Sequence, residues 1–535
     1  MVDEKGTGKK EKGRSSRLFN RFLYSPRSNY YLAAAILLIA MIPRVFYISI
    51  GVLPNGVDEG VDIMAGRMWR FGYDLYSQIN TVQAPVMLTI YGLIEADPVI
   101  FRLFSTLCSL VIMAFVMWVG YRIGGRHVMV AAGSFMALDL MFLHESRLAS
   151  LDMFCLLWVV VGIAYLVRLR QSGRKRSATL MGVSFAIASM IKLFGIIATG
   201  AVGLILLIDL LSELGVFRRI GVSRFLPPKR SGIKLEHIAL FTLSFFLFVL
   251  LIMVRYGVME VIEGTFLNQL NRPISPLSIK LTTFGVFLLL NVIAFPFMFF
   301  GIRSLYRRPE GVILIISGFY LLWFMFQATT WFHHLIFLSP VVALTAGIGV
   351  IEVSKRWSRR KRFRNVPGIT RRVLIYAEVI LVLSAAVIGG GFSYLVKERG
   401  ESIQTRASEI LVDLTDEGDF VISGDPIIAV MANRPMPPEM INVAKLQFPD
   451  ITPENLTRAC IEYAVEVVVL AYHLEEMTEF VDFVEGNYTI KALIKDNEFF
   501  LDNDVTEYRI FHLPIDSRLR TMDDWGIKCH DVSRE

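Results

Sequence analysis

Three carboxylates lie within a five-residue stretch directly after the first membrane-length apolar run: Asp58, Glu59 and Asp62. A charge close to hydrocarbon is costly unless it is paired or hydrated, so acids at this position indicate a site at the membrane–water boundary. In an adjacent pair such as Asp58 and Glu59, one carboxylate can take the proton of an acceptor hydroxyl while the other orients it or stabilises positive charge at a sugar C1. A solvated pair that complements a helix dipole is the alternative.

A second group of ionisable residues falls in the segment HESRLASLDMF, between two later apolar runs. It contains Glu145, Arg147 and Asp152. Asp152 lies about one turn into the following run, where a charge must find a partner, and Arg147 is near enough to supply one. This pair either clamps two helix ends or belongs to a site, and the two roles are compatible.

A single lysine, Lys192, stands between two short apolar stretches. It can bind a lipid phosphate as a compact point charge, or it can extend its charge to water from a helix end.

Aromatic, amide and imidazole side chains complete the candidate residues. Tyr73, Tyr76 and Gln83 follow the carboxylates and suit sugar recognition, although interfacial tyrosines also form aromatic belts. His333 and His334 precede a late apolar run without a carboxylate or cysteine at metal-ligand spacing. We therefore expect a headgroup contact from the histidines and no metal site.

The elements that must position these residues are membrane helices. The chain has 535 residues, of which 54% are hydrophobic, and the excess lies in runs of about 17–25 residues, long enough to cross hydrocarbon. We predict a polytopic α-helical membrane protein with about eleven transmembrane helices. The expected spans are 30–52, 98–120, 127–144, 150–168, 178–192, 194–211, 236–254, 279–301, 310–327, 334–352 and 373–395.

The distribution of Lys and Arg predicts the orientation of these spans. Segment 1–29 is basic, and so is every second loop after it, which places them in the cytoplasm. An odd number of spans puts the tail outside. The predicted domains are therefore a cytoplasmic segment 1–29, a membrane domain 30–395 with its first outer loop at 53–97, and an extracytoplasmic domain 396–535, in a multi-pass plasma-membrane protein.

The charge balance differs between the two parts of the chain. Residues 397–535 carry 28 acidic and 13 basic side chains, whereas the whole chain has a net charge of +7. A basic membrane part suits anionic lipid. Nucleic acid is not expected as a partner, because no Cys/His finger or basic surface interleaved with aromatics is present.

The tail predicts a soluble α/β domain, because helical pieces alternate with short β-branched runs. It lacks a glycine-rich phosphate motif, and it holds two glycosylation sequons, at Asn455 and Asn487. If the tail is outside the cell, Cys460 and Cys529 could form a disulfide.

These motifs together resemble the membrane glycosyltransferases of the GT-C fold, over about residues 30–350. The similar branch comprises the dolichyl-phosphate-mannose protein mannosyltransferases and the relatives that transfer aminoarabinose to lipid A. Their acidic pair after the first span matches Asp58 and Glu59, and their Ser-Arg…Leu-Asp element matches the segment 146–152. A lysine between spans five and six resembles Lys192. The loop ends in Gln83-Ala84-Pro85 where a His and a second Pro are usual in mannosyltransferases.

The resemblance implies transfer of a sugar from a polyprenyl (dolichyl-type) phosphate donor, with inversion at C1, to a protein, lipid or glycan acceptor. Asp58 would be the general base, and the donor phosphate would lie near Lys192, Arg147 or His333. Relatives of this type are generally metal-independent, although a carboxylate loop can hold a divalent cation through waters. The alternatives are a transporter or lipid flippase, and a protein whose tail is the functional part and binds glycan.

Overall fold

The computed structural model describes residues 26–46, 48, 56–95, 97–219, 232–270, 272–305, 311–327, 331–359, 369–399, 402–444, 448, 451–495 and 507–514. The predicted cytoplasmic segment up to residue 25 lies outside these ranges, and so does Cys529, the predicted disulfide partner of Cys460.

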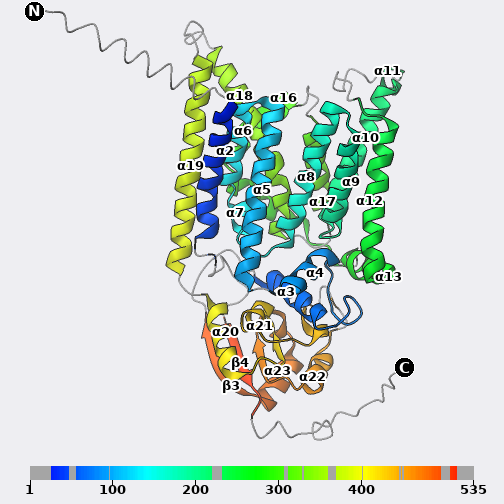
Figure 1. Cartoon of the computed structure of the whole chain (residues 1–535). Coiled ribbons are helices and arrows are strands. Elements are labelled where there is room, and N and C mark those ends of the chain that lie inside the picture. Colours follow the sequence, from blue (N-terminus) through cyan, green and yellow to red (C-terminus); the bar gives the residue numbers. More distant parts are fainter. Residues whose placement is uncertain are drawn as a thin grey trace, which may run out of the picture.

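Most of the first 399 residues form helices that run side by side in one layer (Figure 1). The long helices and their attached short ones are α2 (Pro26–Val45), α5 (Pro98–Gly124), α6 (Arg126–Leu138), α7 (Leu140–Glu145), α8 (Leu151–Ser172), α9 (Lys175–Ser189), α10 (Phe194–Glu213), α11 (Val216–Arg219), α12 (Leu235–Tyr256), α13 (Val258–Val261), η3 (Ile262–Leu267), α14 (Asn268–Leu270), α15 (Leu277–Leu290), α16 (Ala294–Leu305), α17 (Val312–Phe326), η5 (Phe332–Leu338), α18 (Ser339–Ser358) and α19 (Ile369–Arg399).

This arrangement is that of a multi-pass membrane protein. Within the described residues, seven helices are long and apolar enough to cross a membrane, or eight if the bent pair α15–α16 is one span. Each of the eleven predicted runs corresponds to a helix or a broken pair, but α6, α9 and α17 have only 13, 15 and 15 residues. The count of eleven spans is therefore not confirmed.

Polar residues inside apolar runs explain two of the differences from the predicted spans. Asp139 accepts a hydrogen bond from the backbone N–H of Phe142 and divides the 127–144 run into α6 and α7. The 279–301 run bends by 97° between α15 and α16, next to Asn291. The first helix, α2, ends at Val45 rather than at residue 52.

The first outer segment forms two crossing helices, α3 (Gly56–Arg70) and α4 (Pro85–Ile94), which lie between the membrane helices and the C-terminal part (Figure 1). They approach closely because both carry glycine at the crossing. A Cβ added at Gly66 would lie 2.4 Å from the carbonyl oxygen of Leu88, and one at Gly92 would lie 2.2 Å from that of Gly66. The reactive acids predicted from the sequence thus lie on a packed helix.

The C-terminal part contains a four-stranded mixed sheet in the order β1-β2-β4-β3. Strands β1 and β2 are parallel, and the other two pairs are antiparallel. Its elements are α20 (Ile403–Leu414), β1 (Val421–Ser423), α21 (Pro426–Met431), η6 (Pro438–Met440), α22 (Pro453–Glu462), β2 (Val467–Leu470), η7 (Tyr472–Leu474), α23 (Thr478–Asn487), β3 (Thr489–Lys495) and β4 (Glu507–His512).

Alternate residues of β2 face two different cores, as the period of a strand requires. Val467 and Val469 join the large core that also includes the membrane helices, whereas Val468 and Leu470 join a separate core with α22 and α23. The sheet is therefore covered on both faces, and one face is continuous with the packing of the membrane part.

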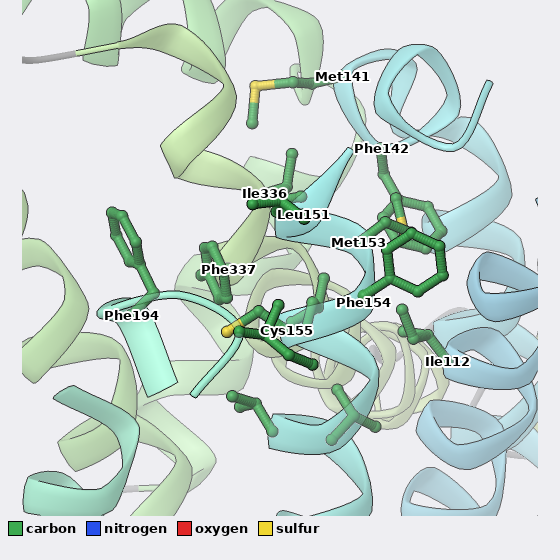
Figure 2. Packing of buried hydrophobic residues seen from close by; sticks show 14 of the residues in the cluster. Ile112, Met141, Phe142, Leu151, Met153, Phe154, Cys155, Phe194, Ile336 and Phe337 are labelled. Carbon is green, nitrogen blue, oxygen red and sulfur yellow. The ribbon is translucent and has the colours of Figure 1, made fainter. Parts of the chain in front are cut away.

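Tight apolar packing surrounds the starts of α8 and α10 (Figure 2). Side chains from α5, α7, α8, α10 and η5 converge there, including Phe142, Phe154 and Ile336. The rings of Phe194 and Phe337 stack with centroids 4.6 Å apart. This packing fixes the starts of α8 and α10, which flank the predicted site.

Candidate active site

Four segments that are far apart in the sequence bring charged side chains together beneath the N-terminus of α3. The Lys192 Nζ lies 2.6 Å from the Oδ2 of Asp152. The Nε2 of His333, at the start of η5, lies 3.6 Å from the same oxygen and 4.0 Å from the Oδ2 of Asp58. The structure thus joins four of the sequence-predicted residues in one group.

Burial distinguishes the acids of this group. The side chain of Asp58 is 63% exposed, whereas those of Asp152 and Lys192 are 4% and 13% exposed. Asp152 also lies in the first turn of α8, where the helix dipole favours a carboxylate. Asp58 is therefore the carboxylate that a substrate can reach, and the buried Asp152–Lys192 pair lies beneath it.

Asp62 lies one turn after Asp58 on α3 and is buried. Burial raises the pKa of Asp62 well above its usual range, the Asp58 and Asp152 carboxylates raise it further, and Lys192 opposes them. This environment disfavours the ionised form of Asp62.

Glu59 occupies a different environment from Asp58, although the two are adjacent. Its Oε1 and Oε2 each lie 2.9 Å from nitrogens of Arg102 in a buried bidentate pair, and the backbone N–H of Ala149 donates to Oε1. Neighbouring residues of a helix point about 100° apart around its axis. Glu59 therefore faces α5, whereas the Asp58 side chain is exposed to solvent. Glu59 thus links α3, α5 and the segment around Ala149, and its catalytic role stays a prediction.

The predicted Arg147–Asp152 clamp is wrong. Arg147 is fully buried and donates to the carbonyl oxygens of Pro43 and Phe46, 2.5 and 2.6 Å away at the end of α2. Asp152 pairs instead with Lys192, so Lys192 holds a carboxylate where a lipid phosphate was considered. Arg147 precedes α8, and its guanidinium donates toward the end of α2 rather than joining Asp152 and Lys192.

Glu145 lies beside the group and is buried. Burial raises the pKa of Glu145, but the hydrogen bond and charge of His144 and the charge of His333 outweigh this and leave it below its usual value. The His144 Nδ1 is 3.2 Å from the Glu145 Oε1. The lowered pKa favours a Glu145 carboxylate beside the imidazoles of His144 and His333.

Of the predicted sugar-recognition residues, Tyr76 is a packing residue. Its hydroxyl donates to the carbonyl oxygen of Gln83 over 2.9 Å, and its ring lies so close to η3 that a Cβ at Gly264 would be 2.3 Å from it. Among the described residues, the side chains of Tyr73 and Gln83 are half-buried and make no hydrogen bond to the charged group.

The sequence reasoning undervalued three residues near the site. Burial lowers the pKa of Arg272, and the nearby Asp58 carboxylate opposes that shift. The Gln327 Nε2 lies 2.7 Å from the Nδ1 of His334, and the buried Lys280 donates to the carbonyl oxygens of Met325 and Gln327 over 2.8 and 2.6 Å. A lysine inside a predicted span was the available signal for Lys280.

We call the residues Asp58, Asp62, Asp152, Lys192, Arg272 and His333 the Asp58 cluster. No group of three or more His, Cys, Asp or Glu residues suited to a metal ion occurs in the part of the chain that the structure describes. Acids and cations are thus interleaved, with one open carboxylate next to several positive charges. Such a site can take a proton from one reactant and stabilise negative charge on another.

Comparisons with known proteins agree with this fold. A sequence model of the dolichyl-phosphate-mannose-protein mannosyltransferase family matches residues 68–262, a range that includes Asp152 and Lys192 but begins after Asp58. No curated protein matches the chain by sequence.

Two solved structures are similar over most of their length. ArnT from Cupriavidus metallidurans, bound to undecaprenyl phosphate, has a TM-score of 0.60 at 14% identity, with 91% of this chain and 98% of that chain covered. The archaeal oligosaccharyltransferase AglB from Archaeoglobus fulgidus, in complex with an inhibitory peptide and a dolichol-phosphate, has a TM-score of 0.52 at 14% identity, with 88% and 74% covered.

The chain therefore has the fold of the GT-C membrane glycosyltransferases, as its motifs predicted. Its resemblance extends to the mannosyltransferase branch through the matched segment 68–262.

Proposed function

We propose that this protein is a membrane glycosyltransferase that moves a sugar from a polyprenyl-phosphate donor to an acceptor hydroxyl at the extracytoplasmic face. The observation that carries the proposal is the open carboxylate of Asp58, 4.0 Å from His333 and above the buried Asp152–Lys192 pair. The neighbours that bind undecaprenyl phosphate and dolichol-phosphate support the donor class. The acceptor is a protein, lipid or glycan.

The proposed reaction is a single displacement. Asp58 takes the proton of the acceptor hydroxyl, and the acceptor oxygen attacks C1 from the face opposite the phosphate. The bond from C1 to the phosphate oxygen breaks, its electron pair leaves with the polyprenyl phosphate, and the configuration at C1 inverts. In this scheme, the Lys192 ammonium, the Arg272 guanidinium and the His333 imidazole stabilise the leaving phosphate.

The buried acids have supporting roles in this scheme. Asp152 holds Lys192 so that the ammonium faces the site. The raised pKa of Asp62 disfavours a second negative charge beside Asp58. The arrangement leaves one carboxylate available as a base, which is what one proton transfer requires.

The test is sugar transfer by purified protein with radiolabelled polyprenyl-phosphate hexose and membrane extract as the source of acceptor. Asp58→Asn should abolish transfer while donor binding persists. Asp74→Asn, an exposed acid of the same outer segment, is the matched control and should keep full activity. Full turnover in Asp58→Asn would remove Asp58 from the mechanism, and no donor consumption by wild type would favour a transporter.

The same assay tests the metal requirement. We expect transfer to persist in EDTA, because the Lys192 ammonium and the Arg272 guanidinium supply positive charge in the Asp58 cluster. Loss of activity in EDTA that Mg²⁺ or Mn²⁺ restores would contradict this and would indicate a cation held through the carboxylates.

A further inference from the structure

The side of α3 that faces away from the membrane helices packs against α21 of the C-terminal domain (Figure 1). The two backbones touch at Gly60. A Cβ added there would lie 2.2 Å from the backbone nitrogen of Ile427 and 2.7 Å from the carbonyl carbon of Pro426. Contacts this short exclude any side chain at position 60 unless the two helices move apart.

Hydrogen bonds extend this contact along the first outer segment. The Arg67 Nη2 donates to the carbonyl oxygen of Val430 over 3.4 Å. Further on, the Asn80 side chain donates to the carbonyl oxygen of Glu439 over 2.7 Å, and the Asn80 backbone N–H donates to that of Pro438. The C-terminal domain thus holds α3 and the following loop at three separate points.

Within its own domain, α21 is firmly attached. The buried Arg434 just after it donates to the hydroxyl and the carbonyl oxygen of Thr415, 2.7 and 2.5 Å away at the end of α20. On the other side, the Gly424 N–H donates to the carbonyl oxygen of Val469 in β2. A shift of α21 would therefore disturb its attachments to α20 and to strand β2.

The N-terminal turn of α3 is consequently held from two opposite directions. Glu59 ties it to Arg102 in α5, and Gly60, the next residue, lies against Ile427 in α21. Asp58 immediately precedes these two anchors. Ile427 and Val430 also share one apolar core with Met64 and Met68 of α3, so the contact is a packed interface.

We infer that α21 is a positioning element of the active site: the C-terminal domain sets the distance from Asp58 to His333 and Asp152 by pressing on α3 at Gly60. The expected effect of this contact on the transfer rate rests on the proposed function, whereas its expected effect on the structure of α3 does not. A sugar-binding module that acts independently would need no such contact with the helix that carries the base.

Gly60→Ala is the sharpest test, because its two possible effects have opposite signs. By helix propensity alone, alanine stabilises a helix by about 1 kcal/mol relative to glycine, which would slow hydrogen exchange in α3. If the α21 contact positions α3, the methyl group separates the helices. Exchange of the amides of 61–70 should then become about tenfold faster, as expected for a local loss of stability. Gly486→Ala, in α23 with open space around it, is the control and should leave α3 unchanged.

The kinetic arm uses the same variants. Transfer by Gly60→Ala should fall about tenfold in kcat while donor binding stays within about twofold, because one misplaced reactive group affects the chemical step. Asn80→Ala, which removes one hydrogen bond without adding bulk, covers the case in which Gly60→Ala fails to fold and should shift both readouts in the same direction, by less. Unchanged or slower exchange in α3 for the variants that fold would overturn the inference. If wild type transfers no sugar, the proposed function fails, and hydrogen exchange still decides the role of α21.

Discussion

At the scale of single residues, neighbouring acids in one sequence motif have separate tasks. Asp58 is open to solvent, Glu59 is locked in a buried bidentate pair with Arg102, and Asp62 is buried with a raised pKa. Helix geometry causes the separation, because each position points in a different direction around α3. A motif of adjacent carboxylates therefore combines one reactive group with the groups that hold it.

Glu59→Gln should destabilise the protein strongly. It leaves Arg102 buried without its counter-charge, which costs about 3–5 kcal/mol. Asp58→Asn removes an exposed, loosely paired acid and should change stability by less than about 0.5 kcal/mol. Thermal unfolding in detergent, followed by tryptophan fluorescence, measures both. If the two variants were equally stable and lost transfer equally, Glu59 would take part in the chemical step and would not serve mainly to pair with Arg102.

Lys192→Met should both destabilise the protein and weaken donor binding. It removes the ammonium partner of the buried Asp152 carboxylate and leaves the His333 Nε2, 3.6 Å away, beside it, at a cost of up to about 3–5 kcal/mol. The double variant Lys192→Met/Asp152→Asn should recover most of the stability but none of the donor affinity, because the two residues are coupled in one pair. Donor affinity that returns in the double variant would show that the phosphate is held elsewhere.

At the scale of elements, the histidines of η5 depend on the end of α17. Lys280 in α15 donates to the last carbonyls of α17, and Gln327, which follows that helix, contacts the Nδ1 of His334. His334 in turn lies edge-on to His333, with ring centroids 4.5 Å apart. Two helix ends and one buried lysine therefore determine where the imidazole of His333 stands.

Lys280→Met should lower transfer without removing any group of the Asp58 cluster. The carbonyl oxygens of Met325 and Gln327 lose a charged donor, at a cost of about 1.5–3 kcal/mol, and Gln327 is free to shift away from His334. Lys355→Met, a partly exposed lysine in α18 that pairs with Glu352, serves as the control. Transfer and thermal unfolding should both fall in Lys280→Met and stay near wild type in Lys355→Met, whereas equal activities would contradict the coupling.

The order of helices and the α/β nature of the tail could be predicted from periodicity and charge, because both are local properties of the sequence. Partner choice could not. Arg147 is the cation close to Asp152 in the sequence, whereas the packed structure pairs Asp152 with Lys192, 40 residues away. Average hydropathy likewise misses single residues such as Asp139, whose local hydrogen bond divides an apolar run. Local sequence patterns thus identify candidate residues of the site, and tertiary contacts determine which of them pair.

At the scale of the whole molecule, one apolar core links the membrane helices, α3 and one face of the sheet. The two parts therefore support each other, and a change in the tail is expected to reach α3. Asp425 is a suitable probe of this connection, because it is fully buried at the start of α21.

Stability should depend on the ionisation of Asp425. Burial raises its pKa from 3.8 to about 6, the Tyr508 hydroxyl opposes the shift, and the Glu59 charge adds to it. The folded state thus binds the proton more tightly than the unfolded state. The contribution of Asp425 to stability is fully present below about pH 4, and it falls by about 3 kcal/mol in total as the pH rises past 6. Asp425→Asn should remove this part of the pH dependence between pH 4 and 7, as measured by hydrogen exchange of the sheet. An identical pH dependence in both proteins would contradict the assignment.

The contact between Arg67 and Val430 joins positions 363 residues apart, at opposite ends of the chain. A ribosome that adds about 5–20 residues per second makes α3 roughly 20–70 s before it makes α21. During that interval α3 lacks its contacts with Ile427 and Val430 of α21. A nascent chain that stalls before residue 426 therefore carries every residue of the Asp58 cluster but lacks the helix that we infer positions Asp58.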